Sequence, residues 1–129
     1  MLLGATAAVL QAAPVHADEP IPAHRVTYTV TSDGQLDVDV YYREVDPPTW
    51  AEYSHNPYQF SPKAEASLAP GQPWVREVTL IDPDRWAMVA ISRTSTSRSG
   101  SIRCTLAVDG ETVAAAEGNA GAVCSLRNW

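Results

Sequence analysis

The chain contains two cysteines, Cys104 and Cys124, and three kinds of chemistry could use them. A metal site would need further Cys or His ligands at suitable spacing, but His24 and His55 stand isolated in the sequence. A catalytic thiol would need a neighbouring histidine or a helix N-terminus to lower its pKa, and residues 101–124 offer neither. In an oxidising compartment an even number of cysteines is typical of a disulfide. We therefore expect a Cys104–Cys124 disulfide, no bound metal and no cofactor.

The second group of interest is an aromatic cluster in a proline-rich segment, residues 43–73. Aromatic side chains that neighbouring prolines hold in place lose little entropy on binding, which suits recognition of a partner protein, a glycan or an apolar ligand. Alternatively, the cluster folds down and caps the open end of the domain. The candidate binding residues are Trp50, Tyr53, His55, Tyr58 and Phe60.

Residues that could catalyse a reaction are few. Ser54 and His55 are adjacent in sequence, which does not by itself orient a base toward a nucleophile. The aspartate pairs at positions 37 and 39 and at 82 and 84 could serve carboxylate chemistry or Ca²⁺ binding, but such pairs are usually solvated surface charge. The polar run 92–100, with Arg93 and Arg98, is typical of a solvated hairpin loop and is alternatively a phosphate or glycan contact. We expect no enzymatic activity.

The N-terminus indicates the compartment in which the protein works. An apolar run precedes Val15, His16 and Ala17, and the small residues at the minus-three and minus-one positions, Val15 and Ala17, suit signal peptidase cleavage after Ala17. We expect residues 1–17 to be a signal peptide and the protein to be secreted or held in the periplasm or cell envelope. An uncleaved anchor and an apolar helix of the fold are the alternatives. A start upstream of Met1 would explain why no Lys or Arg occurs before Arg25.

Charge and size restrict the remaining possibilities. The net charge of −6 argues against binding to nucleic acid or to anionic lipid headgroups, because both require Lys and Arg. Residues 18–129 are sufficient for one domain. The composition, rich in Ala, Val, Asp and Arg, resembles that of actinobacterial proteins.

Alternation of apolar and polar residues predicts an all-β fold. We expect the segments 24–31 and 35–42 to form a hairpin around Gly34, and residues 43–73 to be mostly loop with one short edge strand or helical turn. Trp74 and Trp86 are expected on strands, in the core. Seven short strands favour an antiparallel, immunoglobulin-like β-sandwich. The other five segments are 74–81, 85–93, 101–108, 111–116 and 122–127.

These features together resemble the soluble domain of the mycobacterial MmpS family. The shared pattern is Val-x-Tyr-x-Val, a Pro-Trp pair that opens a central strand, and a Cys-x-Leu-x-Val-x-Gly hairpin followed by a second Cys. The matching positions are Val26, Tyr28, Val30, Pro73, Trp74, Cys104, Leu106, Val108, Gly110 and Cys124.

The resemblance implies a β-sandwich that works outside the cytoplasmic membrane as an accessory to MmpL-type lipid and siderophore transporters. The expected leader and the long segment 43–73 point to a free secreted relative of that family. The leading hypothesis is a non-catalytic exported binding domain of the actinobacterial cell envelope, with an envelope protein, a transporter, a lipid or a siderophore as partner. The alternative is a secreted carrier of a small apolar ligand, bound between the sheets or under the long loop.

Overall fold

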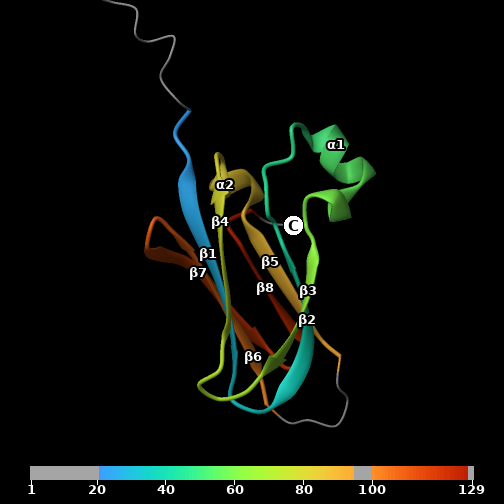
Figure 1. Ribbon diagram of the computed structural model, residues 1–129, viewed down its shortest axis with the longest axis vertical. Helices are drawn as coiled ribbons and strands as arrows, with labels where there is room; N and C mark the ends of the chain where they lie inside the picture. Colours follow the sequence, from blue (N-terminus) through green and yellow to red (C-terminus); the bar gives the residue numbers. More distant parts are fainter. Residues whose placement is uncertain (1–20, 95–99, 128–129) are drawn as a thin grey trace, which may run out of the picture.

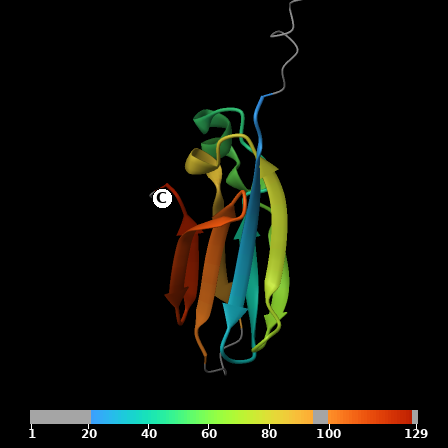
Figure 2. The ribbon, with the colours of Figure 1, turned by 90° about the vertical axis from the view of Figure 1, so that its left-hand side faces the viewer.

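The computed structural model describes residues 21–94 and 100–127, and it contains two antiparallel four-stranded sheets packed face to face (Figures 1 and 2). The expected all-β sandwich is confirmed. Sheet A has the order β4 (Trp74–Leu80), β1 (His24–Ser32), β6 (Ile102–Val108) and β7 (Glu111–Gly118). Sheet B has the order β3 (Lys63–Leu68), β2 (Leu36–Tyr42), β5 (Met88–Arg93) and β8 (Gly121–Ser125). In the described ranges no helix is both long and apolar enough to cross a membrane.

The core forms because the strands alternate. In β1 the apolar residues Val26, Tyr28 and Val30 are fully buried, while the intervening threonines face outward. Strand β2 repeats this arrangement from the opposite sheet. Burying apolar side chains of this size contributes about 1.5–3 kcal/mol each. The other members of the core cluster are Leu36, Val38, Val40, Tyr42, Leu68, Leu80, Ala87, Val89, Ile91, Ile102, Cys104, Leu106 and Cys124.

The predicted hairpin between the first two strands is wrong. Strand β1 pairs with β4 and β6, whereas β2 pairs with β3 and β5, so the connection around Gly34 crosses from one sheet to the other. The connection is fixed by Asp33, whose carboxylate accepts a hydrogen bond from the Ser101 backbone N–H at 2.7 Å. Alternation shows which face of a strand is buried, but two consecutive strands bury the same faces whether they pair or face each other.

The hairpin around the Asp-Gly turn is confirmed. Strands β6 and β7 pair around Asp109 and Gly110, whose φ angles of 52° and 89° are those of a type I′ turn. The Asp109 carboxylate also accepts hydrogen bonds from the His24 ring at 2.7 Å and from the Arg25 backbone N–H at 2.9 Å. The turn is therefore tied to the start of β1.

Regular structure in the middle of the chain differs from expectation in three places. The segment 43–73 contains the expected short edge strand, β3, which brings the number of strands in the described residues to eight, and in addition both helix α1 (Trp50–His55) and the 3-10 helix η2 (Pro57–Gln59). The strand expected at 85–93 begins only at Met88, because a preceding helical turn, α2 (Pro83–Trp86), carries Trp86. Trp86 is buried as expected, but on a helix. Trp74 is half-buried and opens β4, which is an edge strand and not a central one.

The expected disulfide is present. Cys104 on β6 and Cys124 on β8 are bonded, with their Cα atoms 6.2 Å apart. Both residues are buried, and their strands belong to different sheets. The bond therefore joins the two sheets across the core.

The ion pair at the Asp109 turn leads to a prediction about pH. The pKa of Asp109 is held below its ordinary value of 3.8, chiefly by the hydrogen bond from His24 and then by the bond from the Arg25 backbone N–H. This carboxylate therefore stabilises the fold fully above pH 3.8, and the contribution is lost as the pH falls through the lowered pKa. In Asp109→Asn, a residue type that tolerates positive φ, urea midpoints should fall less steeply below about pH 4 than in the wild type. Parallel slopes would contradict this.

Candidate functional site

Helices α1 and α2 lie close together at one end of the molecule (Figure 1). We call it the aromatic end, because it carries Trp50, Tyr53, Tyr58 and Trp86. Thr49 caps α1, because its hydroxyl accepts a hydrogen bond from the Glu52 N–H at 3.1 Å. The helix ends at Asn56, and Pro57 then starts η2. Asp46 holds the segment before α1 against the start of α2 by accepting hydrogen bonds from two backbone N–H groups, those of Ile81 at 2.8 Å and Asp82 at 2.9 Å.

A buried arginine lies at the centre of this end. Arg43 is 0% exposed, and its Nε donates to the Trp86 carbonyl at 2.9 Å while its Nη1 donates to the Ser61 hydroxyl. Its guanidinium also lies over the Tyr53 ring at 4.4 Å and over the Trp86 ring at 5.7 Å. A buried cation is tolerated only when such partners replace water. Arg43 therefore fixes the positions of α1 and α2 together.

The backbone of Arg43 is held from the opposite sheet. The Tyr28 hydroxyl donates to the Arg43 carbonyl at 2.9 Å and accepts from the Met88 N–H at 3.4 Å. The Arg43 N–H donates to the Met88 carbonyl at 2.9 Å. Tyr28 on β1 thus connects sheet A to the junction between β2 and β5.

Burial raises the pKa of the Tyr28 hydroxyl far above its ordinary value of 10.0. The neutral hydroxyl therefore stabilises the fold below pH 10.0, and this contribution is lost as the pH rises further. Replacing Tyr28 by phenylalanine should lower the free energy of unfolding by about 1–2 kcal/mol, because the Arg43 carbonyl loses its donor. The native absorbance rise at 295 nm between about pH 9 and 11 should be the same in wild type and Tyr28→Phe. A rise smaller by one tyrosine in the variant would contradict the assignment.

Aromatic rings continue outward from Arg43 to the surface. Trp50 stacks on Trp86 with centroids 6.2 Å apart, and Tyr53 contacts both rings at 5.4 and 5.5 Å. The Arg127 guanidinium lies 4.4 Å from the centre of the Trp50 ring. Trp50 remains 44% exposed. A stack of this kind holds an exposed tryptophan in a fixed orientation.

A groove of about 320 Å³ lies beside this stack, with three tyrosines in its walls. The rings of Tyr41 and Tyr58 are 5.8 Å apart, and Tyr58 is 70% exposed. The buried Ser61 that lines it is the same residue that accepts the Arg43 hydrogen bond. The lining residues are Tyr41, Tyr53, Pro57, Tyr58, Ser61 and Met88.

The structure brings together three of the five residues proposed from sequence. Trp50, Tyr53 and Tyr58 lie at the aromatic end, where Trp50 and Tyr58 are exposed and Tyr53 is half-buried, whereas Phe60 is buried at 6% exposure. His55 is exposed in the last turn of α1 and does not line the groove. The cluster is therefore partly exposed and partly buried, and its role as a binding surface stays a prediction.

Sequence reasoning missed Arg43, Tyr41 and Met88. Tyr41 carried a usable signal, because it is a tyrosine on the outward face of a strand whose other outward residues are Asp37 and Asp39. Arg43 carried none, because it directly follows the alternating segment and a polar residue there is expected to face solvent. Arg98, named with Arg93 as a possible phosphate contact, lies outside the described residues, as do residues 1–17.

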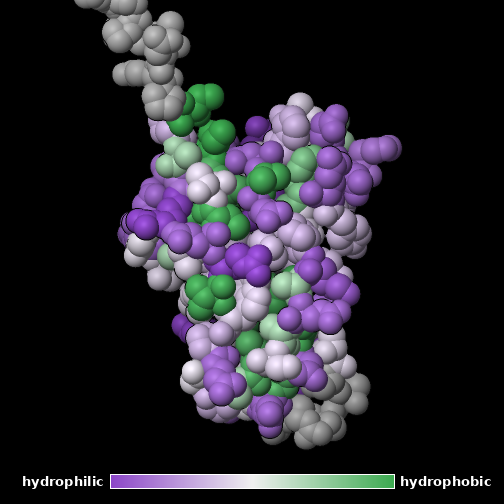
Figure 3. Space-filling model, viewed as in Figure 1, coloured by the Kyte–Doolittle hydropathy of each residue, from purple (hydrophilic) through white to green (hydrophobic). Residues whose placement is uncertain are grey.

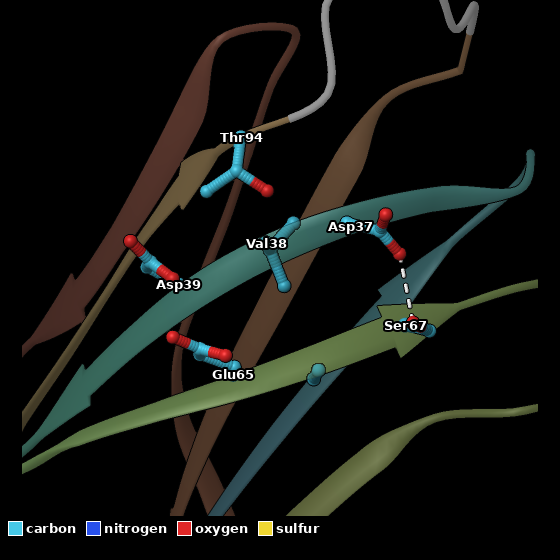
Figure 4. A pocket seen from close by; sticks show the side chains of 7 residues that line it. Asp37, Val38, Asp39, Glu65, Ser67 and Thr94 are labelled. Carbon is cyan, nitrogen blue, oxygen red and sulfur yellow. Dashed lines mark hydrogen bonds between the residues drawn. The ribbon is translucent and has the colours of Figure 1, made fainter.

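Of the aspartates considered from sequence, Asp37 and Asp39 lie apart from the aromatic end, whereas Asp82 and Asp84 lie at the start of α2. Asp37, Asp39 and Glu65 line a groove of about 510 Å³ on the outer face of sheet B. Figure 4 shows their side chains on the two neighbouring strands. Asp37 accepts a hydrogen bond from Ser67 at 2.7 Å, and Asp39 is in register with Glu65 on the neighbouring strand. Within residues 21–94 and 100–127, no group of three or more His, Cys, Asp or Glu side chains is placed to hold a metal ion.

The potential nucleophile Ser54 is turned into its own helix. Its hydroxyl donates to the Ala51 carbonyl at 3.3 Å. This geometry does not direct the hydroxyl proton to the adjacent His55. The arrangement thus provides no observation in favour of a hydrolase, and the expectation of a non-catalytic protein stays a prediction.

Comparison with known proteins places this architecture in a family. The family model described as "Rv2576c beta-sandwich domain" matches residues 28–124, from β1 to β8. Three mycobacterial proteins are each 33% identical over 134 residues, covering 99% of this chain and 78% of the relative. They are "Uncharacterized protein Mb2606c" of Mycobacterium bovis and, from two strains of Mycobacterium tuberculosis, "Uncharacterized protein MT2652" and "Uncharacterized protein Rv2576c". The chain belongs to the Rv2576c β-sandwich domain family.

Proposed function

We propose that this protein is a non-catalytic binding domain, exported to the actinobacterial cell envelope, that recognises a partner protein through its aromatic end. The observation that carries the proposal is the pair of exposed rings, Trp50 at 44% and Tyr58 at 70%. Trp50 stacks on Trp86, which the buried Arg43 contacts, and Tyr58 packs against Tyr41. Preorganised aromatic side chains lose little entropy on binding and are the residue types that dominate interface energetics.

Export is supported by the sequence of residues 1–17 and by the buried disulfide, a bond that persists in oxidising compartments. The finer proposal is an accessory of an MmpL-type transporter of lipids or siderophores. It rests on the resemblance to the MmpS soluble domain.

The experiment is a pull-down from cell envelope extracts with chemical crosslinking and mass spectrometry. Wild-type protein should enrich an envelope or transporter protein that Trp50→Ala/Tyr58→Ala does not enrich. Val75→Ala is the matched control, because Val75 is 53% exposed on β4, outside the aromatic end. Enrichment of the same proteins by the double variant, or of none by the wild type, would contradict the proposal.

The tyrosine groove favours a second candidate function, a carrier of a small apolar ligand. Its volume of about 320 Å³ falls at the lower end of the range of small-molecule sites, about 300–1,000 Å³. It lies under the long loop, whereas the described space between the sheets is occupied by the core cluster. Native mass spectrometry should then detect a co-purifying molecule that is lost in Tyr41→Ala/Tyr58→Ala. If the native masses of the wild type and the double variant differ only by the two substitutions, this groove does not carry a ligand.

A further inference from the structure

A second groove, of about 360 Å³, lies where the start of β1 meets the α2 turn and the β6–β7 turn. It shares no lining residue with the tyrosine groove. The proposed function does not use it. Its lining residues are His24, Ile81, Asp82, Pro83, Asp84, Val108, Asp109, Glu111, Val113 and Leu126.

Aliphatic side chains form part of this groove and remain open to solvent. Ile81 is 50% exposed and Val113 is 39% exposed, and the half-buried Val108 and Leu126 line the groove between other parts of the chain. Figure 3 shows hydrophobic patches separated by hydrophilic residues on the visible face of this end of the molecule, near the start of β1. Adjacent exposed aliphatic residues with a polar border are typical of interaction sites.

The border of the groove is negatively charged. It carries four carboxylates, and only that of Asp109 has a basic partner, His24, in the described residues. Among residues 21–94 and 100–127, Asp82, Asp84 and Glu111 form no ion pair. An apolar surface with three uncompensated negative charges attracts a cationic ligand that also has apolar groups.

The acidic groove on sheet B lacks this combination. Asp37, Asp39 and Glu65 line it together with Val38, Ala66, Ser67 and Thr94, but Val38 is buried in the core at 1% exposure. Glu65 is also paired with Lys63 at 3.6 Å. The sheet B groove therefore presents carboxylates without exposed aliphatic residues of the size of Ile81. It provides a matched internal control.

Charge excludes the alternative occupants of the β1–α2 groove. A second copy carries a net charge of −6 and would be repelled, as would anionic lipid headgroups. The chain's own residues 1–20 contain Asp18 and Glu19 but no Lys or Arg. A metal ion lacks a suitable ligand set within the described ranges.

We propose that the β1–α2 groove is a second interaction surface, which binds an extended segment of a partner protein with alternating basic and apolar side chains. The apolar side chains of the segment contact Ile81, Val113 and Leu126. Its Lys or Arg side chains lie against Asp84 and Glu111 at the border. The domain thereby has two binding surfaces of different chemistry, one aromatic and one acidic.

The test uses a fluorescein-labelled ten-residue peptide of alternating Lys and Val, with binding measured by fluorescence anisotropy. Asp84→Asn/Glu111→Gln should weaken binding about ten-fold, and Val113→Ser should weaken it about three-fold, since these changes remove border charge and apolar contact. The control Asp37→Asn/Glu65→Gln removes the same amount of charge from sheet B and should change the dissociation constant by less than about two-fold.

Two further peptides separate the contribution of apolar contacts to binding from the contribution of charge. A peptide with serine in place of every valine should bind about ten-fold more weakly, and one with glutamate in place of every lysine should not bind. Equal weakening by both double variants would show that only net charge matters and would overturn the proposal, as would absence of binding by the wild type. Circular dichroism melts verify that every variant is folded. The aromatic-end variant Trp50→Ala/Tyr58→Ala should bind the peptide with the same affinity as the wild type.

Discussion

Replacing Arg43 by alanine is expected to lower the free energy of unfolding by about 3–5 kcal/mol. The substitution removes the guanidinium hydrogen bonds to the Trp86 carbonyl and the Ser61 hydroxyl, and it leaves these acceptors buried. It also removes the cation that lies 4.4 Å from the Tyr53 ring centre and leaves a cavity beneath α1. Guanidinium chloride unfolding, followed by circular dichroism, measures the loss.

Two further variants test whether the loss of stability depends on the buried guanidinium of Arg43. Arg43→Lys keeps the positive charge but not the planar fork, so it should recover less than half of the lost stability. Arg103→Ala is the exposed control, since Arg103 is 54% exposed with a 4.0 Å ion pair to Glu117, and it should change stability by less than about 0.5 kcal/mol. An Arg43→Ala protein as stable as the Arg103→Ala protein would refute the central role of Arg43.

The Arg43 variant also tests the link between stability and recognition. Trp50 is oriented by contacts with Trp86 and Tyr53, and both of those rings contact Arg43. In the proposed function, loss of Arg43 should therefore weaken partner binding at the aromatic end under conditions where the variant is folded.

Removing the disulfide has the second large expected effect. Cys104→Ala/Cys124→Ala should lower the free energy of unfolding by about 3 kcal/mol, because the bond closes a loop with a sequence separation of 20. The bond also joins β6 in sheet A to β8 in sheet B, so the edge of sheet B formed by β8 should lose protection first. Hydrogen exchange of residues 121–125 and denaturant unfolding measure these effects.

Reduction of the wild-type protein provides the control for the alanine pair. Both cysteines are buried, at 0% and 1% exposure, so dithiothreitol should reduce the bond only as fast as the domain opens. The reduced wild type and the double variant should then unfold at similar denaturant concentrations. Rapid reduction in the folded state, or unchanged stability of the double variant, would contradict the interpretation of this bond as a link between the sheets.

Much of the sandwich could be predicted from local pattern. The alternation in residues 24–31 and the hairpin at Gly110 were both predicted correctly, because each depends on near neighbours in the chain. The pairing of the two cysteines followed from their even number and the expected export. The prolines in 43–73 correctly indicated a break in regular structure, although they did not reveal α1 or the bounds of β3.

The incorrect predictions of strand pairing and strand bounds share a physical cause. Whether β1 pairs with β2 or faces it across the core depends on contacts with β4 and β6, which follow much later in the chain. The strand expected at 85–93 is shortened because the Pro83–Trp86 turn is fixed by Asp46, and its Trp86 by Arg43, both far away in sequence. Pattern within one segment contains no information on such distant partners.

Side-chain type and short spacing are enough to predict which strand faces are buried, where the chain turns and which two sulfurs can bond. Which strands are neighbours, and the burial of Arg43, emerge only when the whole chain is folded. Only then do tyrosines from β2, α1 and η2 meet in one groove, and only then does Ile81 meet Val113 under a border of carboxylates. These contacts join residues far apart in the chain. Their stability comes from desolvation and charge in the assembled fold, and no single segment contains that information.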